Sequence, residues 1–167
     1  MTTKHIDIAP VTPSNFEVFF SLIVSLANYE KLTPPDDSAK KRLKADAFSE
    51  SPRYFSSLIL FEQKPSGYII YFETYSSFLA KPTLYLEDLF VLPEYRKLKL
   101  GLTAFQFLVK EAERRGCGRI EWQVLDWNQI AIDFYEKLGA KRMKEWYSYR
   151  LEENDLIRLE KELKSIL

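Results

Sequence analysis

The 167-residue sequence has few of the residues that form disulfides and metal sites. Its one cysteine, Cys117, excludes a disulfide within the chain, and its one histidine, His5, leaves little for a metal centre. No apolar run approaches the roughly 18 residues of a transmembrane helix, and the start lacks the apolar segment of a signal peptide. These absences predict a cytoplasmic protein with no metal and no membrane partner.

An excess of charge of one sign is also missing. The 24 basic and 24 acidic residues cancel, whereas a nucleic-acid-binding protein usually has a basic excess or a basic stripe. We therefore expect no nucleic-acid partner. The sequence does have 46% hydrophobic residues, which suffice for a sizeable core, and its length suits a single domain over residues 1–167.

The order of apolar patterns predicts an α/β (α+β) fold, with a mixed, mostly antiparallel sheet flanked by helices. Period-two and β-branched patterns predict strands at 5–9, 54–61, 67–78, 82–92 and 120–125, and a last strand or hairpin at 142–151. Helical spacing predicts helices at about 14–29, 38–48, 105–112, 129–138 and 155–167. Ser14 and Glu17 have the spacing of a capping box at the first helix. One strand–helix–strand crossover implies one parallel join in the sheet.

Two adjacent carboxylates, Glu87 and Asp88, interrupt the otherwise apolar strand at 82–92. Neighbours in a strand point to opposite faces, so at least one of them should face a buried side. Burial raises the pKa of a carboxyl group, and a raised pKa suits a general base working near neutrality. A surface strand, or a carboxylate paired with a nearby lysine or arginine, explains the same residues.

A basic turn follows that strand and precedes the next amphipathic helix. It contains the cations Arg96, Lys97 and Lys99 beside Gly101. The free N–H groups and positive dipole of a helix start suit a phosphate or diphosphate. A solvated basic turn is the plainer interpretation of the same residues.

A third segment contains Trp127 and Asn128, followed by a helix with Phe134 on its core face and Tyr135 at its edge. An edge tyrosine can bury its ring and still present its hydroxyl to a cleft. Aromatic residues at helical spacing more often serve packing alone.

In this order, the three segments resemble the GNAT superfamily of acyl-CoA N-acyltransferases. The Arg-x-x-Gly-x-Gly/Ala loop of that family is matched at Arg96 to Gly101, and its Asn…Phe-Tyr…Leu-Gly helix at Asn128 to Gly139. Tyr85-Leu86-Glu87-Asp88, Trp127-Asn128 and Ala27-Asn28-Tyr29-Glu30 resemble the diamine (spermidine/spermine) acetyltransferase branch. The sequence departs from the family at Lys99, where the loop usually has glycine. If that position needs a positive φ, lysine costs about 1 kcal/mol; otherwise its side chain can point outward and assist phosphate binding.

The resemblance implies direct transfer of acetyl from acetyl-CoA, as cosubstrate, to a primary amine. It implies that Glu87 is the base, acting through water, and that Tyr135 donates a proton to the sulfur. The implied cofactor-binding residues are Phe90, Val91, Arg96, Lys97, Leu98, Lys99, Leu100, Gly101, Leu102, Asn128 and Tyr135. The implied substrate-binding residues are Tyr29, Glu30, Glu87, Asp88 and Trp127.

The expected partner is a small cationic amine: a polyamine, a diamine or a lysine-like amine. Asp36 and Asp37 are further candidates for an acidic mouth of the site, or for ordinary surface charges. Two alternatives stay open: an acetyltransferase acting on protein N-terminal or lysine amines, and a non-catalytic acyl-CoA-binding regulatory module. The resemblance also predicts a homodimer, to which Trp146, Tyr147 and Tyr149 could contribute.

Overall fold

The computed structural model describes residues 5–166. The chain divides into two compact units, one ending at Gln123 and the other beginning at Val124. Each unit is described by itself below. None of the helices in the described range is long and apolar enough to cross a membrane.

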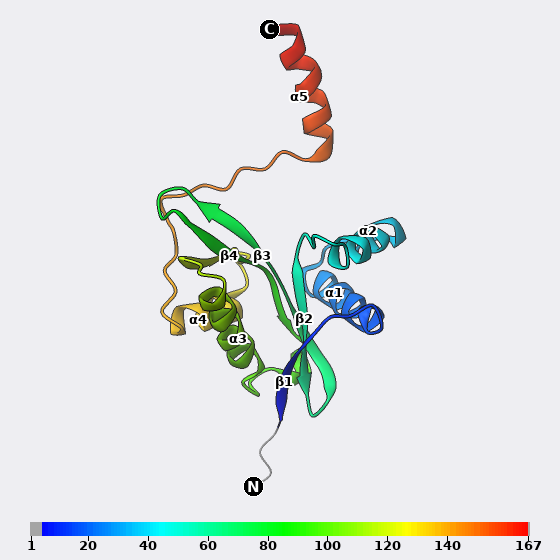
Figure 1. The fold of residues 1–167 in the computed structure, drawn as a ribbon, viewed down its shortest axis with the longest axis vertical. Coiled ribbons are helices and arrows are strands. Elements are labelled where there is room, and N and C mark those ends of the chain that lie inside the picture. The colour runs from blue at the N-terminus through cyan, green and yellow to red at the C-terminus, as the bar shows by residue number, and fades with distance from the viewer. Residues whose placement is uncertain (1–4, 167) are drawn as a thin grey trace. The chain divides into compact units, whose positions relative to one another are not determined.

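The first unit is built on a five-stranded sheet in the order β1-β2-β3-β4-β5 (Figure 1). The first four strands are antiparallel, and β5 runs parallel to β4 after a crossover through α3. The strands are β1 (Ile6–Pro10), β2 (Phe55–Phe61), β3 (Lys64–Ser76), β4 (Lys81–Val91) and β5 (Arg119–Trp122). The helices are α1 (Phe16–Glu30), α2 (Asp37–Ala47) and α3 (Leu100–Arg114), with a short 3-10 turn at Pro93–Tyr95.

Two hydrophobic cores form, one on each face of this sheet. The core beneath α3 includes Leu84 and Leu86 of β4 with Leu100 and Leu108 of α3. The core beneath α1 includes Phe19 with residues of β2, β3 and β4. Figure 1 shows α1 and α2 on the opposite side of the sheet from α3. The predicted α/β class, the mixed sheet and its one parallel join are confirmed.

The second unit contains α4 (Gln129–Lys137) and α5 (Glu153–Ile166). Asn128 caps α4 as expected, since its Oδ1 accepts a hydrogen bond from the N–H of Ala131 at 3.3 Å. Gly139 follows α4 with a φ of 84°, the left-handed conformation that glycine adopts freely.

Two local predictions were wrong. The segment 142–151 forms no strand in the described chain, because alternating aromatic residues make a strand only where a neighbouring strand supplies hydrogen bonds. The first helix starts at Phe16, and Asn15 rather than Ser14 is its N-cap residue. The Asn15 side chain instead accepts a hydrogen bond from the N–H of Thr12 at 2.8 Å, which stabilises the preceding turn.

Candidate active site

A β-bulge in β4 lies at the two candidate carboxylates. In the ladder with β3, Leu86 is opposite Tyr71 and Asp88 is opposite Ile70, so Glu87 is an extra residue without an opposite partner. The bulge changes which face of the sheet the following residues point to. Leu86 packs in the core beneath α3, whereas Phe90, an even number of residues later, packs beneath α1. Bulges commonly redirect side chains next to functional sites.

Asp88 is the carboxylate of the pair that the structure withdraws from solvent. Burial raises its pKa to about 6, opposed by a hydrogen bond from Tyr68 and assisted by the negative charges of Glu87 and Glu30. The Tyr68 hydroxyl donates to Asp88 Oδ2 at 3.1 Å. Glu87 itself is exposed. The expectation that at least one of the two carboxylates faces a buried side is therefore confirmed, by Asp88.

The C-terminal end of α1 supplies the third carboxylate of this group. Burial raises the pKa of Glu30, and its charge acts on both Asp88 and Tyr68. Its neighbour Tyr29 packs its ring 6.3 Å from that of Phe90, measured between centroids. The structure thus brings together Glu30, Glu87 and Asp88, which we call the acidic cluster.

Strand β4 is paired on only one side beyond the bulge. Its parallel ladder with β5 runs from Thr83 to Leu86 and does not include the residues from Glu87 to Val91. On the other side, β3 approaches closely because Gly67 lies opposite Val91. A Cβ atom at Gly67 would lie 2.2 Å from the carbonyl oxygen of Phe90. The backbone at Phe90 and Val91 is thus held from the β3 side.

The basic turn between β4 and α3 has an unusual backbone. Lys97 and Lys99 have φ values of 63° and 69°, in the left-handed region that disfavours residues other than glycine. Of the two possibilities given for Lys99, a positive φ or an outward-pointing side chain, the structure shows the first: the position has a positive φ. Lysine there costs about 1 kcal/mol relative to glycine.

This turn leads directly into the N-terminus of α3. Lys99 is the N-cap residue and its side chain makes no capping hydrogen bond. The first amide N–H groups of a helix have no intrahelical acceptor, and they carry the positive end of the dipole. Together with Lys97 and Lys99, they form a site suited to a diphosphate.

Arg96 connects the basic turn to β4 and to the end of α1. Its Nε donates to the carbonyl oxygen of Val91 at 3.2 Å. Its guanidinium carbon lies 4.5 Å from the centre of the Tyr29 ring, within the range of a cation–π contact. The arginine that sequence reasoning assigned to phosphate binding thus also packs on a residue predicted to bind the substrate.

The remaining predicted site residues belong to the second unit. Asn128 and Tyr135 lie at the start and near the end of α4, and Trp127 precedes the cap. The rings of Phe134 and Tyr135 are in edge contact, with centroids 5.3 Å apart. Asp36 and Asp37, the further candidates, lie instead at the start of α2 in the first unit, where Asp36 is the N-cap and accepts a hydrogen bond from the N–H of Ala39 at 2.7 Å. Asp36 is accounted for by this capping role.

Sequence reasoning missed Tyr68, which is fully buried beside Asp88. A tyrosine inside a strand most often serves packing, so the residue type alone does not mark it as part of a functional site. The signal that could have found it is positional: Tyr68 lies two residues before Ile70, the partner of Asp88, and so on the same face.

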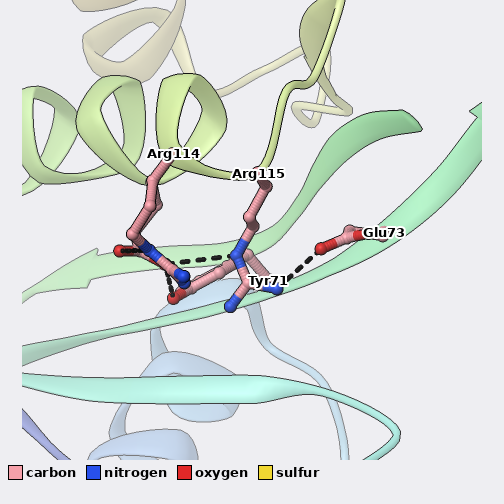
Figure 2. A network of polar contacts seen from close by, with 5 residues as sticks. Tyr71, Glu73, Arg114 and Arg115 are labelled. Atoms are coloured by element: carbon pink, nitrogen blue, oxygen red, sulfur yellow. Dashed lines mark hydrogen bonds and ion pairs between the residues drawn. The ribbon is translucent and has the colours of Figure 1, made fainter. Parts of the chain in front are cut away.

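A second polar group, which the sequence did not indicate, lies on the α3 face of the same sheet. Tyr71 and Arg115 both contact Glu111, and Arg115 reaches Glu73 at 2.6 Å. Figure 2 shows Arg115 beside Tyr71 and its ion pair with Glu73. Arg114 also contacts Glu111, at 2.8 Å. We call Tyr71, Glu73, Glu111, Arg114 and Arg115 the arginine network. It borders a pocket of about 440 Å³ that is lined by β1, β2, the segment between α2 and β2, Tyr71 and the end of α3.

No group of three or more histidine, cysteine, aspartate or glutamate side chains within the described range is arranged to hold a metal.

Comparison with known proteins gives the family. Residues 21–140 match the acetyltransferase (GNAT) family model. Over 142 residues, the chain is 34% identical to the thialysine N-epsilon-acetyltransferase of Bos taurus, covering 78% of this chain and 83% of that one. Over 86 residues, it is 44% identical to the L-ornithine N5-acetyltransferase NATA1 of Arabidopsis thaliana, covering 52% of this chain and 38% of the relative.

Solved structures agree on the fold. An integron cassette protein from the mobile metagenome of V. cholerae superimposes with a TM-score of 0.79 at 24% identity, covering 93% of this chain and 98% of that one. The family match covers more than half of the sequence, and the bovine relative is aligned over most of both chains. The chain belongs to the GNAT acetyltransferase family.

Proposed function

We propose that this protein transfers acetyl from acetyl-CoA to a primary amine of a small cationic acceptor: a diamine, a polyamine or a lysine-like amine. The observation that carries the proposal is the acidic cluster. The negative charges of Glu87 and Glu30 help to raise the pKa of Asp88, and no lysine or arginine in residues 5–166 forms an ion pair with any of the three carboxylates. A cationic ligand is the natural complement of such a group.

The names of the relatives support a small amine acceptor. Thialysine and L-ornithine, the acceptors in those names, are small molecules with an amino group on a side chain. An alkylammonium with an ordinary pKa of about 10.4 must lose a proton before its nitrogen can attack a carbonyl carbon. We assign this proton to Glu87, through a water molecule, while Asp88 and Glu30 hold the remaining positive charge.

The residues present fit acetyl-CoA. The basic turn from Arg96 to Leu102 and the start of α3 would hold the diphosphate, for which the free amides and cations are suited. The backbone of Phe90 and Val91 would hold the acyl end, where β4 has no β5 neighbour. Bound there, acetyl-CoA supplies the acetyl group as a reactive thioester.

Two residues of α4 complete the assignment by family resemblance. Asn128 would contact the pantetheine arm; its Oδ1 already accepts a hydrogen bond from the helix start, which leaves its amide group to donate. Tyr135 would donate its hydroxyl proton to the departing sulfur. Trp127 and Tyr29 would contact the acceptor.

The direct test is thiol release from acetyl-CoA in the presence of single amines. The panel holds spermidine, putrescine, lysine, thialysine, ornithine and a short peptide with a free N-terminus. Turnover with a small cationic amine supports the proposal, and the preferred amine names the acceptor class. Turnover with the peptide alone contradicts it and favours a protein acetyltransferase.

Two variants assign the roles in the same assay. Glu87→Gln should lower turnover most at low pH, where the amine is protonated, and an unchanged pH profile would remove Glu87 as the base. Tyr135→Phe should lower turnover by about 10²-fold without unfolding the protein. Wild-type turnover in Tyr135→Phe would exclude its role as the proton donor. A homodimer and a cytoplasmic location stay predictions.

A further inference from the structure

The bulge places Asp88 beside a tyrosine rather than a leucine. With uninterrupted alternation, Asp88 would share the face of Leu84 and Leu86, in the core beneath α3. The extra residue Glu87 moves it to the face of Phe90. There Tyr68, which is opposite Phe90 in the ladder, is its diagonal neighbour on β3.

Tyr68 is closely packed on this face of the sheet. Its side chain is 0% exposed, and its ring meets that of Phe19 edge-on, with centroids 5.4 Å apart. It also contacts the Phe90 ring, at 6.1 Å between centroids. These contacts fix the direction of the hydroxyl, which donates to Asp88 Oδ2 at 3.1 Å. One oxygen of the carboxylate is thereby fixed, and the other remains to accept a second partner.

The charges that face Asp88 are all negative. Glu30 faces it from α1, and Glu87 lies beside it on β4. From β3, the Tyr68 hydroxyl donates a hydrogen bond to it. The nearby cation Arg96 donates to the Val91 carbonyl and stacks on Tyr29. The hydrogen bond from Tyr68 is therefore the contact in this group that favours the charged form of Asp88.

We propose that Tyr68 is a positioning residue, which holds the Asp88 carboxylate in place as the anchor for an ammonium group of the acceptor amine. This inference rests on the proposed function and adds to it a residue that touches neither substrate. It also implies that binding of the amine weakens at acid pH. Protonation of Asp88 removes the anchor, and loss of the Tyr68 donor makes protonation easier.

The experiment compares Tyr68→Phe with the wild type and with Tyr54→Phe. The first variant keeps the ring that packs on Phe19 and removes only the donor. The control removes another partly buried tyrosine hydrogen bond, from the Tyr54 hydroxyl to the carbonyl oxygen of Leu43 at 2.7 Å, far from the acidic cluster in sequence. Steady-state kinetics are measured from pH 5 to pH 9 with the best amine of the panel.

Tyr68→Phe should raise the KM for the amine about tenfold, the effect expected for a hydrogen bond to a charged group. The KM for acetyl-CoA should stay the same. The acid limb of kcat/KM should move to higher pH. In an Asp88→Asn background, Tyr68→Phe should have no further effect on the KM for the amine, because the two residues act as a unit. Tyr54→Phe should change neither the KM for the amine nor the acid limb.

A purely structural tyrosine would give a different result. If Tyr68→Phe lowers the melting temperature but leaves the KM for the amine and the acid limb unchanged, the inference is overturned. Calorimetric binding of putrescine to each variant separates this inference from the proposed function. Binding that depends on Tyr68, in a wild type with no turnover, supports the anchor and rejects the reaction. If the wild type binds and turns over none of the amines, both are rejected.

Discussion

Two tyrosines of β3, Tyr68 and Tyr71, each donate a hydrogen bond of 3.1 Å to a carboxylate, on opposite faces of the same sheet. The carboxylates respond in opposite ways. The pKa of Asp88 is raised to about 6 by burial. The pKa of Glu111 is lowered to about 2, first by its hydrogen bond to Arg114 and then, against the effect of burial, by Arg115 and Tyr71.

The difference lies in the cations. Arg114 contacts both oxygens of Glu111, at 3.0 and 2.8 Å, and Arg115 adds a contact at 3.1 Å. The acidic cluster has no such partner within residues 5–166. A carboxylate whose charge is fully met by the protein has a structural role, whereas a carboxylate left with a raised pKa can respond to a ligand. The comparison thus separates the group that stabilises the fold from the group suited to binding.

The largest expected effect comes from removing the more buried arginine of the network. Arg115→Met should lower the free energy of unfolding by about 3 kcal/mol, because Glu73 and Glu111 lose a half-buried partner. The cation–π contact with Phe55, at 3.9 Å, is lost as well. Urea unfolding at pH 7 measures the change. Arg114→Met, at a more exposed arginine, should lower the free energy of unfolding by less. An equal loss of stability would contradict the difference in burial between the two arginines.

The next largest effect is a change in stability that has opposite signs in the acidic cluster and in the arginine network. Asp88→Asn should raise the free energy of unfolding at pH 8 by on the order of 2 kcal/mol, since it removes a charge whose pKa is raised. The folded pKa of Asp88 is above its ordinary value of 3.8, so the gain is present above pH 6 and fades as the pH falls from about 6 to 3.8.

Glu111→Gln is the matched control, and it should lower stability at the same pH. The folded pKa of Glu111 is below its ordinary value of 4.5, so its contribution is present above pH 4.5 and is lost as the pH falls towards 2. Thermal unfolding across pH 3 to pH 8 measures both variants. Changes of the same sign at pH 8 would show that the two carboxylates do not differ as described.

A smaller effect is expected for Tyr71→Phe, the counterpart of Tyr68→Phe. It should cost about 1 kcal/mol of stability, the usual value of one hydrogen bond. The arginines keep Glu111 ionised without the tyrosine, so the loss should not depend on pH between 5 and 8. Kinetics of this variant should show an unchanged KM for the amine; a raised KM would mean that the arginine network also serves the acceptor.

The smallest expected effect is that of salt. Raising NaCl from 50 to 500 mM should raise the KM for a diamine about threefold, because screening weakens the attraction between separated charges. The melting temperature should change little over the same range, since the ion pairs of the network are in direct contact. A salt-independent KM would indicate an acceptor held by contacts other than charge.

The sequence allowed most of the elements to be predicted, because their signals are local. Most strand and helix ranges from residue 5 to 137 agree with the structure within a few residues, but the helix predicted at about 105–112 starts earlier, at Leu100. The carboxylate pair and the basic turn were also found, since each combines charged residues with an abrupt change in an apolar pattern. The order of these segments in the sequence carried the family resemblance.

The rest depended on contacts between strands. Alternation alone could not show that Asp88 is less exposed than Glu87, because the bulge is a property of the β3–β4 pairing. The partner tyrosines and the arginine network join residues up to 42 positions apart. The strand predicted at 142–151 was wrong for the same reason. An alternating pattern shows a preference for strand structure, but it does not show whether a neighbouring strand is there to pair with it.

The bulge also bears on how related proteins should be compared. The position of Asp88 depends on the number of residues between Leu86 and Phe90 as much as on which residues they are. Inserting one residue between Glu87 and Asp88 would keep every charged group, yet alternation after the bulge would direct Asp88 into a leucine-lined core. An alignment that scores identities and tolerates a one-residue gap in β4 would therefore group proteins with this acidic cluster together with proteins that cannot form it. The number of residues in this part of β4 is therefore more informative about the site than sequence identity.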